Sequence, residues 1–331
     1  MESKEAIRLS PSTLALMDYC SYAPALRRME DPATGMAFEP SYGDGTKEIM
    51  HKGTYFEACF ENPESPSPSF RNTQEKIAFS SWMKRADDEK TLGRIRSAAT
   101  YVRNEVINEI HHSQKEYEEY VFDWYRLGPM YEDFRASLKT GEENVIIDVK
   151  FSGDPEIYYK REFRRLQVPI YQMAEVLSRA NEDSEKLLEA FALDMKGMVA
   201  RASEIASEIE VLPGYVLFVR NASDKSDHYH KAPPLYRMQS SRLSGDDLIS
   251  LNRILCRIVS GIRPLIEKGP RFDLSTYRAI AGEAKCTGGY PMKGDCPFLQ
   301  KCPIGRHIYQ QENPFSIQET IREIDGRLRG L

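Results

Sequence analysis

The sequence predicts an α/β fold in which a central mixed sheet is flanked by helices. Two strand-like segments, residues 130–138 and 144–151, are joined by a polar turn at 140–144 and have the pattern of a β-hairpin. A second pair of strand-like segments comes late in the chain, at 215–219 and 235–238. Segments with helical apolar spacing precede and follow both pairs, as expected of an α/β domain.

We expect the N-terminal third of the chain to be helical. A helix over 12–29 begins at a Ser/Pro cap, and a second helix over 46–61 precedes a loop at 62–69 that is rich in proline and serine. Two further helices are expected over 74–85 and 88–112. These segments supply helices that flank the sheet.

The rest of the chain supplies the other strands and helices. A strand is expected over 119–126, just before the hairpin. Residues 157–210 are mostly helical with a break near 181–183, and 184–209 has the apolar spacing of a packed helix. A last helix over 245–268 precedes a segment that contains cysteine, glycine and proline.

The composition is that of a soluble globular protein. The 331 residues are 41% hydrophobic and 29% charged, with a formal net charge of −5. We expect a central core at 116–245, with helical regions at 1–115 and 246–331 that pack together. No apolar run approaches the ~20 residues that span a bilayer, so no membrane association and a cytoplasmic location are expected. An acidic balance does not exclude nucleic-acid binding, which needs only a local basic path.

Two acids and a lysine near the middle of the chain indicate metal-dependent chemistry. Asp133 lies in the first strand of the hairpin, and Asp148 and Lys150 lie in the second. Alternate residues of a strand share a face, so Asp148 and Lys150 project to the same side. Carboxylates hold Mg²⁺ or Mn²⁺, which activates water for phosphodiester hydrolysis, and a lysine adds positive charge beside the phosphate. A solvated surface pair is the alternative interpretation of this Asp-x-Lys tripeptide.

The helix expected after the hairpin carries Gln167 and Tyr171 in the pattern Gln-x-x-x-Tyr. The order of an upstream acid, an Asp-x-Lys strand and a Gln-x-x-x-Tyr helix resembles the PD-(D/E)xK nuclease superfamily, and within it the RecB-like branch. The segments 132–134 and 147–150 are most similar to RecE-type exonucleases of phages and prophages, also called exodeoxyribonuclease VIII.

This resemblance implies a restriction-endonuclease-like core and a role for each motif residue. Asp133, Asp148 and the carbonyl of Val149 would hold the metal. Lys150 would be the catalytic lysine. The motif residues of the helix, Gln167 and Tyr171, would contact DNA or support the site.

Two more acids are candidate ligands. RecB-like nucleases carry a Gly-x-x-x-His or Gly-x-x-x-Glu motif on an N-terminal helix, and Gly53 to Glu57 fits that spacing with glutamate in the ligand position. His51 is the alternative ligand there, although helix packing is its more ordinary role. Glu132 stands where the family usually has proline before the first acid, and it remains a weaker rival to Asp133.

Four of the six cysteines form a second motif, with one near the start of the chain and three near its end: Cys20, Cys286, Cys296 and Cys302. Together with the phrase at 9–20, they resemble the iron-sulfur nucleases of the CRISPR-adaptation, AddB and exonuclease V types. That resemblance implies a [4Fe-4S] cluster held by four thiolates, in a helical subdomain formed by both termini.

Alternatives to the cluster remain open. Nine residues separate Cys286 from Cys296, where the family more often has two, which leaves the cluster type undecided. A zinc site would use the same four ligands. Buried inert thiols are the third interpretation, and they suit Cys59 and Cys256, which lie in apolar helical segments.

Four basic residues precede Gln167 and are candidate DNA contacts: Lys160, Arg161, Arg164 and Arg165. A solvated helix face is the alternative. Together, the motifs predict a Mg²⁺- or Mn²⁺-dependent exonuclease acting on single- or double-stranded DNA ends. The resemblances imply a single-strand annealing protein of phage recombination, or an integrase of CRISPR adaptation, as partner. A catalytically idle DNA-binding subunit of the same fold is the alternative function.

Overall fold

The computed structural model describes residues 7–11, 13–14, 44–70, 72–86, 91–152, 163–179, 181–220 and 234–267. Most of the helix expected over 12–29 lies outside these residues. So do Cys20, Cys286, Cys296 and Cys302, together with Lys160 and Arg161. The predictions that depend on these residues stay predictions.

The chain divides into two compact units. One comprises Met1–Pro11 and Gly43–Arg257, and the other comprises Ser12–Tyr42 and Ile258–Leu331. Apart from the end of the last helix, the elements below belong to the first unit. The three-part division expected from the sequence stays a prediction.

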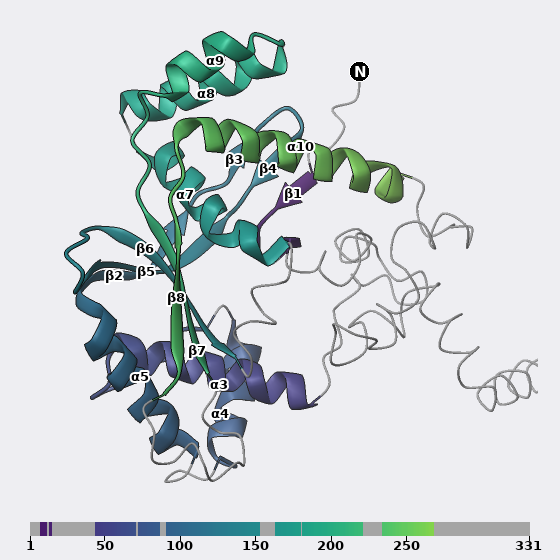
Figure 1. The fold of residues 1–331 in the computed structure, drawn as a ribbon. Helices are drawn as coiled ribbons and strands as arrows, with labels where there is room; N and C mark the ends of the chain where they lie inside the picture. Colours follow the sequence, from purple (N-terminus) through teal and green to yellow (C-terminus); the bar gives the residue numbers. More distant parts are fainter. Residues whose placement is uncertain are drawn as a thin grey trace, which may run out of the picture. The chain divides into compact units, whose positions relative to one another are not determined.

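A five-stranded mixed sheet forms the centre of the first unit (Figure 1). In chain order its strands are β2 (Ile107–Tyr117), β5 (Met130–Leu138), β6 (Val145–Ser152), β7 (Gly214–Arg220) and β8 (Tyr236–Ser241). They are arranged side by side in the same order, with β6 and β7 parallel and the other neighbours antiparallel. The predicted α/β fold with a mixed sheet is confirmed, and β5 with β6 is the predicted hairpin.

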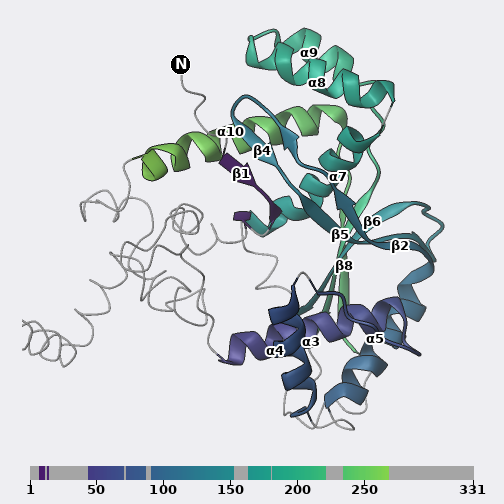
Figure 2. The same cartoon turned by 180° about the vertical axis from the view of Figure 1, so that it is seen from behind.

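Three helices pack on one face of this sheet: α3 (Asp44–Glu61), α4 (Thr73–Met83) and α5 (Gly93–Val106) (Figure 2). Their apolar side chains form a core with the odd-numbered residues of β6. Phe56 of α3 stacks on Phe151 of β6, with ring centroids 4.5 Å apart. Because side chains alternate along a strand, the even-numbered residues of β6, including Asp148, face the opposite side.

Helix α7 (Gln167–Ser178) covers that opposite side, after a single turn of 3-10 helix, η2 (Phe163–Leu166). It lies very close to the start of β7. A Cβ atom built on Gly214 would be 2.3 Å from Cγ1 of Val168, a distance that no real contact reaches. The absence of a side chain at Gly214 therefore sets how closely α7 approaches the sheet.

The chain between β6 and β7 also contains α8 (Glu182–Met195) and α9 (Val199–Ala206). The predicted break near 181–183 is confirmed, because Asn181 caps α8 by accepting a hydrogen bond from the Asp183 N–H. Helix α10 (Gly245–Glu267) follows β8. Arg253 of α10 donates from Nε to Oδ2 of Asp194 in α8 at 2.8 Å.

The strand expected over 119–126 proved to be two short strands. They are β3 (Tyr120–Val121) and β4 (Tyr125–Leu127), which pair antiparallel and form a small sheet with β1 (Ile7–Leu9). The Phe122 N–H donates to the Tyr125 carbonyl at 2.8 Å, which closes a tight turn between them. This turn, at Asp123 and Trp124, divides the expected strand in two.

The helix expected over 88–112 ends early, and this part of the prediction was wrong. Helix α5 ends at Val106, and β2 begins at the next residue. Strand β2 pairs with β5 from Ile107 opposite Leu138 to Tyr117 opposite Met130. The hydrogen bonds of that pairing outweigh the weak local preference for helix, which a sequence pattern cannot anticipate.

Truncation of Phe56 tests the core between α3 and the sheet. Phe56 is fully buried, so Phe56→Ala is expected to lower the free energy of unfolding by about 3–5 kcal/mol, through lost burial and an unfilled cavity. Urea denaturation measures the loss. The control is Ile77→Ala, at a helical position that is 60% exposed, where a change within about 0.5 kcal/mol is expected. Equal losses in both variants would contradict this packing.

Candidate functional site

The candidate site lies where β5 and β6 part from each other. The two strands pair from Ala136 opposite Val145 to Phe134 opposite Ile147, and their pairing ends there. Immediately beyond, the Val149 N–H donates to Oδ2 of Asp133 at 2.9 Å. The carboxylate thus satisfies a backbone donor that continued pairing would have satisfied, which fixes Asp133 beside the strand that carries Asp148.

Asp148 accepts two hydrogen bonds on the side of the sheet that α7 covers. Nζ of Lys150 donates to its Oδ1 at 2.7 Å, and Nε2 of Gln167 donates to the same oxygen at 2.8 Å. Nε2 of Gln167 also lies 3.1 Å from the hydroxyl oxygen of Tyr171. Asp148 is 1% exposed and the Lys150 side chain 17% exposed, so the pair differs from a solvated surface pair.

Burial controls the protonation of this site. It raises the pKa of Asp148 to about 7; the Lys150 charge opposes the rise and the Asp133 charge adds to it. Burial also raises the pKa of Tyr171, with a further contribution from the charges of the two aspartates. The Lys150 charge therefore offsets only part of the cost of ionising Asp148 in this buried position.

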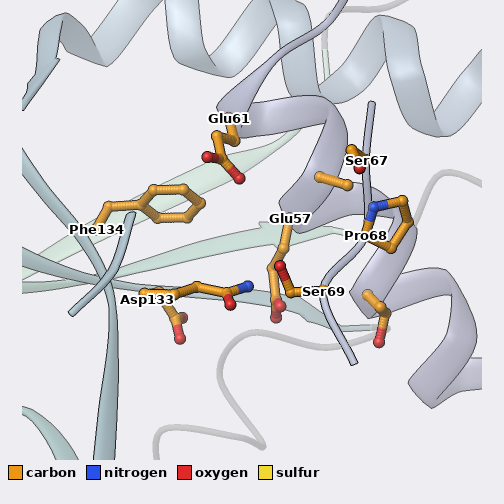
Figure 3. Close-up of a pocket in the computed structure, with 10 residues that line it drawn as sticks. Glu57, Glu61, Ser67, Pro68, Ser69, Asp133 and Phe134 are labelled. Carbon is orange, nitrogen blue, oxygen red and sulfur yellow. The ribbon is translucent and has the colours of Figure 1, made fainter. Parts of the chain in front are cut away.

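Glu57 lines a small pocket together with Asp133. The pocket has a volume of about 30 Å³, room for a water molecule or a single ion. In Figure 3, Glu57 and Glu61 project into it from α3, and Asp133 projects from β5. Glu57 is therefore placed beside an expected metal ligand by a helix distant in sequence.

His51, the alternative ligand on α3, is packed among aromatic rings. Its ring stacks on Trp82 with centroids 5.8 Å apart and meets Phe79 edge-on at 5.9 Å. Burial lowers the pKa of His51, and the charge of Arg85 lowers it further. Glu57, and not His51, shares the pocket with Asp133.

Glu132, the rival to Asp133, is engaged elsewhere. It is fully buried, and both its carboxylate oxygens accept hydrogen bonds from Arg135. The hydroxyl of Tyr117 donates to it as well. Asp133 is the acid of this pair that contacts β6.

The donor set suits a hard divalent cation in kind. Such cations prefer carboxylate and carbonyl oxygens, which Asp133, Asp148 and the Val149 backbone supply. Glu57 shares its pocket with Asp133. Within the described ranges, however, no three histidine, cysteine, aspartate or glutamate side chains are gathered into a ready metal-binding group. The types of ligand atom therefore suit such a cation, whereas a gathered set of three ligand side chains is not formed within the described ranges.

Two of the four basic residues border the site. Arg164 and Arg165 of η2 line a pocket of about 120 Å³ together with Asp148. Positive side chains thus stand beside the buried acid.

Two cysteines were expected to be inert thiols. Cys59 is buried and Cys256 half-buried, and burial raises the pKa of both thiols.

Two features of this region escaped the sequence analysis. Gln114 of β2 has a positive φ of 51° and lines the pocket with Glu57 and Asp133, and no sequence pattern indicates such a backbone. Glu175 lies eight residues after Gln167 on the same side of α7. Extending the Gln-x-x-x-Tyr spacing by one turn would have found it.

The pH dependence of stability tests the burial of Asp148. Its folded pKa of about 7 exceeds the 3.8 of an ordinary aspartate, so the folded protein binds this proton more tightly than the unfolded chain does. The contribution of protonated Asp148 to the free energy of unfolding is therefore present near pH 4 and is lost as the pH rises through about 7. Asp148→Asn keeps the acceptor Oδ1 without the charge. At pH 8 its free energy of unfolding should exceed that of the parent protein by up to about 4 kcal/mol.

Urea denaturation at several pH values measures this difference, which should vanish towards pH 4. The control is Asp123→Asn, an exposed acid outside the site, with a change within about 0.5 kcal/mol at every pH. A difference for Asp148→Asn that does not vary with pH would contradict the raised pKa.

Comparison with protein-family models, with curated proteins and with solved structures finds no match to the chain. In the part of the chain that the structure describes, no helix is long and apolar enough to cross a membrane. The geometry of the site is therefore what bears on the function.

Proposed function

We propose that the protein is a metal-dependent deoxyribonuclease of the PD-(D/E)xK type that hydrolyses DNA from its ends. One observation carries the proposal: Asp133, Asp148 and Lys150 meet where β5 and β6 part, with Gln167 of α7 on Asp148. A surface Asp-x-Lys pair would have neither the burial nor the second acid. The mixed sheet flanked by helices is compatible with a restriction-endonuclease-like core.

Each residue of the site has a part in this chemistry. Asp133, Asp148 and the Val149 carbonyl would hold Mg²⁺ or Mn²⁺, with Glu57 as a further ligand. When bound, such an ion supplies a water of lowered pKa and positive charge for the phosphate. Gln167 holds the Asp148 carboxylate in one orientation. The Lys150 ammonium stabilises the negative charge that develops on the phosphate oxygens.

The basic residues of η2 favour a nucleic acid as substrate. Arg164 and Arg165 line a pocket with Asp148, so a backbone phosphate held by either guanidinium would lie next to the acid. Action at DNA ends is what the resemblance to RecE-type exonucleases implies. The proposed partner is a single-strand annealing protein, or an integrase if the chain trims DNA in CRISPR adaptation.

An idle DNA-binding subunit of the same fold is the second candidate function. The observation that favours it is the direct ion pair of Lys150 with Asp148, in which the lysine neutralises the carboxylate that would otherwise face a metal. In an active enzyme this pair would have to open for Asp148 to hold a metal. In an idle subunit it stays closed, and DNA binds without cleavage.

Cleavage of end-labelled linear DNA in the presence of Mn²⁺ tests the proposal. Asp148→Asn and Lys150→Met are each expected to lower the rate by at least about a hundredfold. The first removes a carboxylate that would hold the metal, and the second removes the positive charge beside the phosphate. Gel-shift assays should show that both variants still bind DNA. Asp123→Asn, outside the site, serves as the control with unchanged cleavage.

The form of the substrate separates the candidates. A covalently closed circle should survive while linear DNA is degraded, and cutting of the circle would indicate an endonuclease. A double variant of Asp148 and Lys150 with full activity would overturn the site assignment. Binding without cleavage by the parent protein would favour the idle subunit.

The terminal cysteines carry a separate proposal, a [4Fe-4S] cluster that fastens the two ends of the chain together. Anaerobically purified protein should contain about four irons per chain and show a broad visible absorption band. Cys296→Ser should lose the iron and the band, whereas Cys256→Ser, outside the motif, should keep both. Zinc in place of iron would retain the four ligands and change the metal. If Cys296→Ser binds as much metal as the parent protein, the cluster proposal is wrong.

A further inference from the structure

Glu175 continues the line of polar side chains on α7. It lies one turn beyond Tyr171 and two turns beyond Gln167, so the three project from the same side of the helix. Gln167 reaches Asp148 in β6. Glu175 reaches instead to β2 and β5. Polar contacts therefore attach α7 to the sheet both at Gln167 and at Glu175.

Two charged donors converge on one oxygen of Glu175. Its Oε2 accepts from Nη2 of Arg135 at 2.7 Å and from Nζ of Lys115 at 2.6 Å. The hydroxyl oxygen of Tyr117, whose proton is donated to Glu132, lies 3.0 Å from the same oxygen. Burial alone would raise the pKa of Glu175, but the hydrogen bonds from Arg135 and Lys115 outweigh it and lower the pKa to about 2. Glu175 is therefore a carboxylate anion at any physiological pH.

Arg135 connects this anion to the strand that carries Asp133. Its guanidinium also donates to both oxygens of Glu132, at 3.1 Å from Nε and 3.0 Å from Nη2. Glu132 and Arg135 stand on either side of Asp133 along β5. Phe134, between them, packs against Phe60 in the core, with ring centroids 5.2 Å apart. The residues flanking Asp133 are thus held in place from both faces of the sheet.

Such a network is a costly way to hold a helix on a sheet. Arg135 is 3% exposed and Glu132 is fully buried, and removing these charges from water costs free energy that their attraction only partly returns. Apolar side chains would pack α7 at least as well. The planar guanidinium of Arg135 adds orientation, because it forms its hydrogen bonds only with carboxylates that lie in particular positions around it. The network therefore determines the position of α7.

We infer that Glu175 is a positioning residue of the candidate site. Held by Arg135, it fixes α7 relative to β5, so that Gln167 stays on Asp148 while Asp133 stays beside Val149. Glu175 itself touches neither of these aspartates, and its effect passes through Gln167. The catalytic part of the inference rests on the proposed nuclease function; the fixing of α7 does not.

Hydrogen exchange tests the fixing of α7 without any assay of activity. Glu175→Gln keeps the oxygen acceptor but removes the charge, and Glu132 still pairs with Arg135, so the variant should fold. Its amides over 167–178 should exchange at least about tenfold faster than in the parent, because α7 opens more readily. Unchanged exchange in α7 would overturn the inference.

The control is Asp194→Asn, which removes another buried acid from an ion pair with arginine, between α8 and α10. It should destabilise the protein comparably and leave exchange in α7 at the parent rate. Should Glu175→Gln fail to fold, Lys115→Met is the second variant. It removes one donor from the partly exposed edge of the network and should accelerate α7 exchange by a smaller factor.

Cleavage kinetics test whether α7 acts through Gln167. Glu175→Gln should lower kcat about tenfold with KM for DNA within about twofold, because Arg164 and Arg165 are retained. Asp194→Asn should leave both constants unchanged. In a Gln167→Ala background the further loss from Glu175→Gln should disappear, since the residue it positions is already absent.

Fully additive losses in that double variant would overturn the positioning role, because Glu175 would then act independently of Gln167. Failure of the parent protein to cleave any DNA would overturn the nuclease proposal and the catalytic role together. In that case the exchange experiment still decides whether Glu175 fixes α7. The two failures are thus distinguishable.

Discussion

The hydrogen bond from the Val149 N–H to Asp133 is the contact on which the arrangement of the site depends. A sheet cannot leave a buried backbone donor without a partner, and here a side chain takes the place of the diverging strand. Asp133, at the point where β5 leaves β6, also lines the small pocket beside Glu57, and the hydrogen bond fixes this carboxylate. A structural requirement of the backbone and the placement of a candidate ligand are met by the same contact.

Burial of β6 on both faces gives Asp148 its properties. Helix α3 packs on the odd-numbered residues and α7 covers the even-numbered ones, so an acid in the middle of the strand is removed from water. The Lys150 ammonium compensates for part of that loss and Gln167 for another part. Stability is given up at this position, as is common where a site must bind something that the isolated protein lacks.

Local sequence patterns were sufficient for the hairpin and for α3, α4 and α7, but not for the end of α5. The spacing of Asp148 and Lys150 placed both on one face because strand geometry is regular, and the Gln-x-x-x-Tyr spacing placed two residues on one side of a helix for the same reason. Strand β2 was missed because its conformation comes from pairing with β5, whose residues are separated from their partners by 13 positions (Tyr117 to Met130) to 31 positions (Ile107 to Leu138). The network around Arg135 was missed because it joins three elements that nothing in the sequence marks as neighbours.

The close approach of α7 to β7 restricts the amino acid at one position more than any local rule does. Gly214 has an ordinary strand conformation, and what excludes a side chain there is the body of Val168 on the helix above. The glycine at position 214 is therefore required by the short distance between α7 and the sheet. A related chain that keeps α7 at this height should keep glycine at this position even where the rest of β7 has diverged. One with a larger residue there must carry its Gln-x-x-x-Tyr helix farther from the acids.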